Sequence, residues 1–207
     1  SAQKVADLVA KLDNQQVAAN QLQGEVAAAR RQFDSSIAAY RKAYQLAPDE
    51  TQPMVALVGS YLRAGKLKEA QSFLQSVLAA SPDNLDARLL QARLLAQSGD
   101  VPGARQDYDA VLARQPKNTT AWLGLANLQI VAGQLDEADA TMQQAIKQAP
   151  EDFSLRLARA SLMEQRGKSE EAIKMYEQLL KERPNAQVVI NNLASLLAET
   201  RTTEADF

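Results

Sequence analysis

Residues 119–152, TTAWLGLANLQIVAGQLDEADATMQQAIKQAPED, decide the fold of this chain. Apolar residues recur at helical spacing on both sides of Gly133, and Pro150 follows the second of these segments. Glycine closes a helix at low cost because it tolerates a positive φ. Proline ends the preceding helix because it pushes the residue before it out of the helical region. The stretch therefore predicts a helix, a glycine turn, a second helix and a proline turn.

The same punctuation recurs along the whole chain with a period of 34 residues. Three series keep one register: Pro48, Pro82, Pro116, Pro150 and Pro184; Gly65, Gly99, Gly133 and Gly167; and Ala70, Ala104, Ala138 and Ala172. A fixed period of this length is the signature of a repeat protein. Short polar residues after each proline are predicted to cap the next helix, namely Asp49, Asp83, Asn84, Asn118, Asp152 and Asn185.

This unit resembles the tetratricopeptide repeat (TPR) family. Residues 119–152 match the family's motif in order at Trp122, Leu125, Ala126, Gly133, Ala138, Met142, Ala145 and Pro150. The resemblance implies an all-α fold, a right-handed superhelical solenoid of 34-residue helix-turn-helix repeats. Other units depart from the motif, with Arg88 and Arg156 at the place of Trp122, and Gln91 and Arg159 at that of Leu125. We expect these arginines to lay their stems on apolar surface and to keep their charged heads in water.

The register divides residues 1–207 into a single array. Five whole repeats occupy residues 17–50, 51–84, 85–118, 119–152 and 153–186. Residues 1–16 are predicted to be the second helix of a preceding repeat, with Asn14 where the proline would fall. Residues 187–207 are predicted to be a partial sixth repeat, in which Thr203 to Asp206 has the form of a capping box for a further helix. These partial repeats favour a fragment of a longer protein.

The composition excludes several kinds of chemistry. The chain has no His and no Cys, so a histidine base, a cysteine nucleophile, a disulfide and the usual zinc site are excluded. We therefore expect no enzyme, no cofactor and no metal. The 23 basic and 25 acidic residues form no block of like charge, which argues against nucleic acid as a partner. No apolar run is long enough to insert into a membrane.

The resemblance implies that partners bind in a concave groove formed by the first helices. At the family's groove positions the candidate peptide-binding residues are Val55, Leu89, Leu123, Leu157, Arg63, Arg93, Gln97, Asn127, Ile130 and Gln165. Apolar anchors beside amide and guanidinium donors suit an extended peptide or an amphipathic helix. An equal alternative for the leucines is a place in the core, and Trp122, Tyr40, Tyr108 and Tyr176 are expected to be core residues.

The function predicted is a non-catalytic protein–protein interaction scaffold that binds an extended peptide or a partner helix in this groove. The sequence is similar in style to bacterial TPR proteins of the cell envelope, including those of exopolysaccharide synthesis and of secretion, so we expect a periplasmic or envelope-associated location. The cytoplasm is the alternative location. The alternative function is a self-assembly module of a cytosolic bacterial TPR protein, and the oligomeric state stays open.

Overall fold

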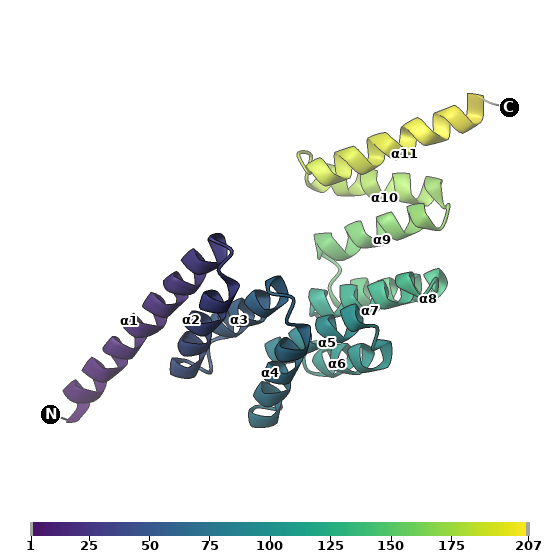
Figure 1. Cartoon of the computed structure of the whole chain (residues 1–207). Helices are drawn as coiled ribbons and strands as arrows, with labels where there is room; N and C mark the ends of the chain where they lie inside the picture. Colours follow the sequence, from purple (N-terminus) through teal and green to yellow (C-terminus); the bar gives the residue numbers. More distant parts are fainter. Residues whose placement is uncertain (1, 206–207) are drawn as a thin grey trace. The chain divides into compact units, whose positions relative to one another are not determined.

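A computed structural model describes the backbone of residues 2–205 and the side chains of residues 14–200. Within these residues the chain forms eleven helices and no strand (Figure 1). The helices are α1 (Ala2–Ala29), α2 (Phe33–Leu46), α3 (Thr51–Arg63), α4 (Leu67–Ala80), α5 (Leu85–Ser98), α6 (Val101–Arg114), α7 (Thr119–Val131), α8 (Leu135–Gln148), α9 (Phe153–Gln165), α10 (Ser169–Glu182) and α11 (Gln187–Ala205). The predicted all-α, helical-repeat fold is confirmed.

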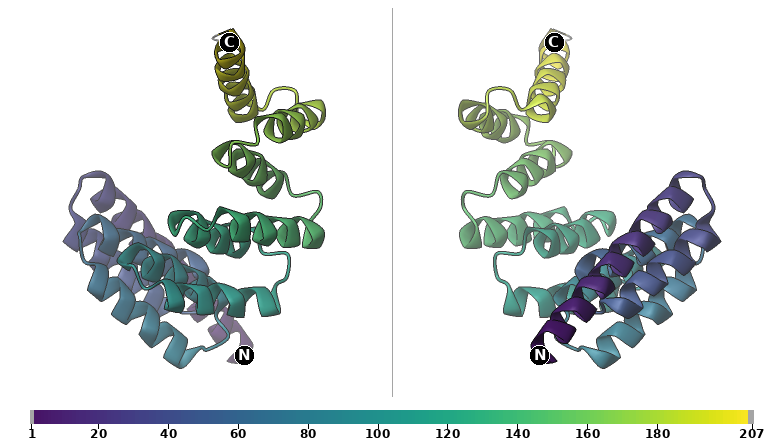
Figure 2. Two further views of the ribbon diagram at one scale, coloured as in Figure 1. Left: turned by 90° about the vertical axis from the view of Figure 1, so that its right-hand side faces the viewer. Right: turned by 90° about the vertical axis from the view of Figure 1, so that its left-hand side faces the viewer.

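The helices fall into two compact units, residues 1–94 and residues 95–207. In the first unit α1 packs on α2, α2 on α3, and α3 on α4 (Figure 2). Its core gathers side chains from successive repeats, namely Ile37, Tyr40, Met54, Leu57, Val58, Tyr61, Ala70, Leu74, Val77, Ala87 and Leu94. Each helix pair thus buries its apolar face against the next pair, as expected for a repeat protein.

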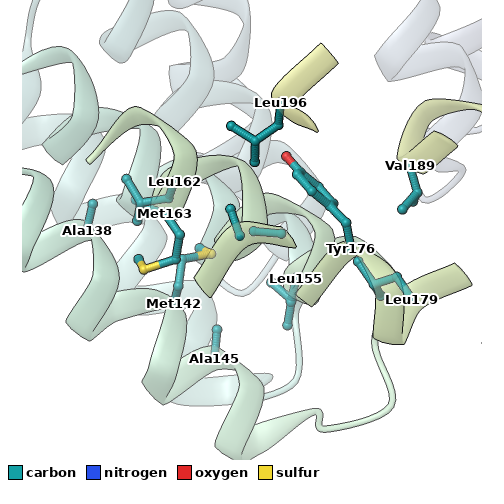
Figure 3. Close-up of a cluster of buried hydrophobic side chains, with 13 residues drawn as sticks. Ala138, Met142, Ala145, Leu155, Leu162, Met163, Tyr176, Leu179, Val189 and Leu196 are labelled. Atoms are coloured by element: carbon teal, nitrogen blue, oxygen red, sulfur yellow. The ribbon is translucent and has the colours of Figure 1, made fainter. Parts of the chain in front are cut away.

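The second unit continues the pattern from α6 to α11, and its first helices also touch, α7 with α9 and α9 with α11. Its largest fully buried side chains include Met142, Leu155, Met163 and Tyr176 (Figure 3). The prediction that Tyr40, Tyr108 and Tyr176 are core residues is confirmed, since each is at most 9% exposed. Trp122 is half-buried and packs against the same cluster.

The turns between first and second helices are built as the glycine series predicts. Gly65, Gly99, Gly133 and Gly167 all have a positive φ, between 72° and 85°. At the first of these turns the Lys66 amide donates to the Tyr61 carbonyl at 2.9 Å, which closes the end of α3. In the repeat before, Arg31 takes the place of glycine and still adopts φ 58°.

The proline turns place the helix cap two residues after the proline. Side-chain oxygens of Asn84, Asn118 and Asp152 accept from the first-turn amides of the helices that follow. The caps predicted at Asp49, Asp83 and Asn185 are wrong, because these residues lie one position too early: each is the second residue of a two-residue turn that begins at the proline, and the cap follows it. At the true cap of α3, Glu50 makes no side-chain capping bond.

Both terminal predictions differ from the structure. Helix α1 runs without a break through Asn14, so residues 1–16 are not a separate second helix. Asparagine keeps its backbone N–H and lacks the ring with which proline breaks a helix, which explains the continuity. Helix α11 likewise runs through Thr203 to Ala205, so the predicted capping box starts no new helix there, and Asp206 lies outside the described residues. The side chains of residues 1–13 also lie outside them.

Candidate functional site

The predicted groove residues lie on first helices, but their exposure differs between the two units. On α3 Val55 is 43% exposed, and Arg63 lies two turns further along the same face and is also exposed. In the second unit Leu123, Ile130 and Leu157 are half-buried and pack against the hydrophobic cluster. The core alternative for the two leucines is therefore supported by their packing.

The polar candidates are more accessible than the apolar ones. Among the predicted residues, Leu89 is half-buried, whereas an exposed set comprises Arg93, Gln97, Asn127 and Gln165. The structure therefore leaves Val55, at 43% exposure, as the one predicted apolar anchor that is exposed.

A hollow in the first unit lies between α1 and α3 and has a volume of about 450 Å³. We call it the α1–α3 trough, and its lining residues are Gln21, Glu25, Ala28, Ala29, Tyr40, Gln52, Ala56 and Arg63. Of the predicted site residues only Arg63 lines it. Apart from Tyr40, which belongs to a second helix, the lining residues lie on two adjacent first helices, the surface where the resemblance places the groove.

Sequence reasoning missed most of this trough because it searched for apolar anchors and charged donors. The signal was present in the repeat register, since Gln21, Glu25 and Ala29 occupy the family's groove positions. Three of the eight lining residues are alanines, and a search for bulky or charged residues does not select such small side chains. Tyr40 was placed in the core, and it is both buried and part of the lining.

Tyr40 reaches the trough because Gly24 lets its ring approach α1. A Cβ atom added at Gly24 would lie 2.8 Å from two ring carbons of Tyr40, which is closer than real contacts allow. Burial raises the pKa of Tyr40, the nearby charge of Glu25 raises it further, and Arg63 opposes both effects. The phenol is therefore uncharged at neutral pH and can donate a hydrogen bond.

The polar groups of the trough are unpaired. The Gln21 Nε2 atom is buried and has no hydrogen-bond partner. Among the described residues, neither Glu25 nor Arg63 forms an ion pair, and the Tyr40 hydroxyl has no hydrogen-bond partner. Unpaired buried donors cost free energy, so this surface is poised to gain from a ligand that pairs with them.

Tyr176, one of two tyrosines at the same repeat position in the second unit, is paired. Tyr176 donates to Glu164 Oε2 at 2.9 Å, lies 3.0 Å from Ser161 Oγ and accepts from Asn192 Nδ2 at 3.3 Å. Burial raises the pKa of Tyr176, with hydrogen bonds from the neighbours acting in both directions. Its ring lies among Leu155, Leu179 and other apolar side chains (Figure 3).

Arginine at the tryptophan place of the motif can reproduce the tryptophan's bond. The Trp122 Nε1 atom donates to the Pro116 carbonyl at 2.8 Å, and the Arg88 Nη2 atom donates to the Pro82 carbonyl at 2.8 Å. Both carbonyls lie six residues before their donors and belong to the proline turn that precedes the helix. In these two repeats the side chain at the motif position ties the first helix to its preceding turn, whereas Arg156, at the same position, bonds Glu182 instead.

The expectation that arginine heads lie in water is wrong for Arg159, whose bond to Asp139 is partly buried, whereas Arg156 forms an exposed ion pair. Both Nη atoms of Arg156 bind the Glu182 carboxylate, at 2.5 and 2.6 Å. The Arg159 Nε atom donates to Asp139 Oδ1 at 2.8 Å. Second helices on either side of α9, α8 and α10, supply these carboxylates, which the arginine positions alone did not indicate.

Comparisons with known proteins give one family. A family model described as tetratricopeptide repeat matches residues 27–94, 61–106 and 95–162, and a second model of the same description matches residues 153–196. No curated protein sequence matches the chain significantly. In the described part of the chain, no helix combines the length and apolar character needed to cross a membrane.

Several solved structures are similar in fold. A thermophilic TPR protein of Thermus thermophilus, TTC0263, is 19% identical, with 88% of this chain and 99% of that chain covered and a TM-score of 0.66. PilW, a type IV pilus biogenesis factor, is 21% identical, with 88% and 85% covered and a TM-score of 0.65. Yeast Tom70 is 18% identical, with 94% and 42% covered and a TM-score of 0.72. At these identities the likeness concerns the fold alone.

Proposed function

The chain belongs to the tetratricopeptide repeat family, and on that premise we propose that it binds an extended peptide or a partner helix on its first helices. The family's proteins are in general non-catalytic scaffolds for protein–protein interaction. The observation that carries the proposal is the α1–α3 trough, whose lining includes unpaired polar groups and Ala56, the residue that follows the exposed Val55 on α3.

The face of α3 supports this proposal through its spacing. Val55, Gly59 and Arg63 follow one another at intervals of four residues and so share one face of the helix. Their span is about 12 Å at 1.5 Å per residue, close to the length of about four residues of extended peptide. An apolar anchor at one end and a guanidinium at the other match a short peptide that carries an apolar residue and a hydrogen-bond acceptor.

The test uses peptides selected from a displayed random library against the full chain. Their dissociation constants are measured by calorimetry for the wild type and for Val55→Arg, which we expect to weaken binding about tenfold or more. Leu46→Arg is the matched control, because Leu46 is 39% exposed on a second helix and lies outside the proposed surface. Equal effects of the two substitutions, or none from Val55→Arg, would contradict the proposal.

A second candidate function is self-assembly, which an apolar stripe on α1 favours. Leu22 is 61% exposed and Val26 is 42% exposed, one helical turn apart. Adjacent exposed apolar residues of this kind are candidates for part of a contact surface. Light scattering after size-exclusion chromatography tests it: a mass that rises with concentration and falls in Leu22→Lys supports assembly, and a constant monomer mass contradicts it.

We further propose a bacterial envelope setting, in exopolysaccharide or secretion machinery, with the cytoplasm as the alternative. The absence of Cys supports it, since no thiol is present to be oxidised in the periplasm. The likeness to a type IV pilus biogenesis factor is compatible with it. Fractionation of cells that carry the native gene, probed with an antibody against this chain, tests the location, and recovery in the cytoplasmic fraction would refute it.

A further inference from the structure

We infer that the α1–α3 trough is a subsite for a carboxamide, the side-chain group of glutamine or asparagine, supplied by the bound partner. The inference rests on the proposed function and names the chemistry that one part of its surface recognises. It draws on a comparison between two equivalent places in the repeat array, one open and one filled by the protein's own side chains.

The filled place surrounds Tyr176, and the open place surrounds Tyr40. Ser161, Glu164 and Asn192 bind the Tyr176 hydroxyl. The residues four repeats earlier, beside Tyr40, are Glu25, Ala28 and Ala56. The carboxylate of Glu164 and the carboxamide of Asn192 thus have no counterpart at Ala28 and Ala56, and these two alanines line the trough. Side chains of the length of Glu164 and Asn192 at these two positions would project into the hollow.

The unpaired groups in the trough include both donors and an acceptor. Gln21 Nε2, the Tyr40 hydroxyl and the Arg63 guanidinium can donate, whereas the Glu25 carboxylate accepts. A carboxamide is the neutral side-chain group that accepts through its oxygen and donates two hydrogens through its nitrogen. Asn192 supplies this group to the tyrosine at the equivalent place, where its Nδ2 atom lies 3.3 Å from the hydroxyl.

Other side chains fit this set of groups less well. A carboxylate would be attracted by Arg63 but repelled by Glu25, and an ammonium would be attracted by Glu25 but repelled by Arg63, so neither gains a net charge advantage. An apolar side chain would fill the volume but would leave the buried Gln21 Nε2 atom without a partner, which costs free energy. The trough holds one charge of each sign, so a neutral ligand with both a donor and an acceptor suits it best.

The test uses N-acetyl-L-glutamine methylamide as probe and follows it by NMR on the isotope-labelled full chain. A ligand of this size binds with a dissociation constant on the order of millimolar. We expect shifts of the Gln21 side-chain amide and of backbone amides in α1 and α3. The corresponding glutamate, lysine and norleucine compounds are expected to bind about fivefold or more weakly. Equal binding of any of the three would overturn the inference.

Two substitutions locate the probe. Ala56→Asn places a carboxamide where Asn192 stands in the equivalent site, and we expect it to fill the trough and weaken the probe about tenfold or more. Ala38→Asn, on the exposed face of α2, is the matched control and should leave binding unchanged. Tyr40→Phe removes one hydroxyl and should weaken the probe roughly two- to tenfold. Unchanged affinity in Ala56→Asn would overturn the inference.

The outcomes separate this inference from the proposed function. If selected peptides depend on Val55 but the probe binds without preference, the surface is right and the carboxamide subsite is wrong. If the probe binds in the trough but peptide affinity ignores Val55, the subsite stands as a small-molecule site and the peptide-binding proposal fails.

Discussion

One pair of equivalent positions, where a second helix meets the next first helix, is apolar in the first unit and ionic in the second. Ile37 and Leu57 belong to one buried cluster of the first unit. Three repeats later the same positions hold Asp139 and Arg159, which form an ion pair at 2.8 Å. Arg166 adds a second bond to Asp139 at 2.7 Å. The repeat register therefore fixes where a contact is made, and its chemistry is free to change.

The sites around Tyr40 and Tyr176 also differ between the units, but here the polar groups of the second unit are paired and those of the first unit are not. Around Tyr176 the second unit pairs its own polar groups, whereas around Tyr40 the first unit leaves them open. The first unit thus has an apolar pair where the second unit has the Asp139–Arg159 ion pair, and it leaves polar groups of its trough without protein partners. This contrast places the better candidate for a binding surface in the first unit.

The largest expected effect comes from breaking the ionic junction. Asp139→Ile leaves Arg159 and Arg166 half-buried without their shared carboxylate, and we expect it to lower the free energy of unfolding by about 2–4 kcal/mol. Adding Arg159→Leu rebuilds the apolar pair of the first unit and should regain at least half of that loss, because well-packed apolar replacements of buried ion pairs are often neutral. Urea unfolding followed by circular dichroism measures both.

A second variant at this junction separates the effect of burying an ion pair from the effect of losing its charge. Asp136 also pairs with Arg166, but its side chain is 87% exposed. Asp136→Ala should therefore cost less than about 1 kcal/mol, as exposed ion pairs do. If the double variant were less stable than Asp139→Ile alone, the apolar pair of the first unit could not replace the ion pair of the second unit.

Protonation of Asp139 at acid pH should lower the free energy of unfolding, but by less than the substitution Asp139→Ile does. Burial raises the pKa of Asp139, but hydrogen bonds from Arg159 and Gln143 and the charge of Arg166 bring it below its ordinary value. A depressed pKa means that the carboxylate stabilises the fold fully above the unfolded-state pKa, about 4, and that this stability is lost as the pH falls through the folded-state value.

Unfolding experiments at a series of pH values test this directly. The wild type should lose more stability between about pH 5 and pH 3 than the variant that carries both Asp139→Ile and Arg159→Leu, because the other carboxylates are common to both proteins. Parallel curves for the two proteins would show that Asp139 titrates as it does in the unfolded chain.

The tyrosine comparison predicts a smaller difference. Tyr176→Phe removes a hydroxyl that Ser161, Glu164 and Asn192 all bind, so it should cost about 1–2 kcal/mol. Tyr40→Phe removes a hydroxyl without a protein partner and should change stability by less than about 0.5 kcal/mol. Paired thermal and urea unfolding of the two variants measures the difference, and equal costs would mean that the Tyr40 hydroxyl is satisfied in solution.

Much of the fold could be predicted from single residues. The four glycine turns and the buried tyrosines follow from the period alone, since each of these residues is there for a conformational or packing reason that recurs in every repeat. The site could be predicted only in part. The register position predicted Arg63. The trough, in contrast, is lined by Ala28 and Ala56, whose side chains are too short to carry a recognisable polar group. The partners of Arg156 and Arg159 lie 26 and 20 residues away and require the packed structure to identify them.

The smallest expected effect concerns the one turn that departs from the glycine series. Arg31 adopts φ 58°, and the amide after it donates to the Ala27 carbonyl at 2.9 Å, as the amide after Gly65 donates to Tyr61. A left-handed conformation costs a residue with a side chain about 1–2 kcal/mol, whereas glycine makes the unfolded chain more flexible by about 0.4–1 kcal/mol. Arg31→Gly should therefore stabilise the protein by about 0.5 kcal/mol in urea unfolding, and Gly65→Ala should destabilise it. A loss of stability in Arg31→Gly would show that the arginine side chain makes contacts beside Asp34 and Lys66, which line the same surface hollow, that outweigh its backbone strain.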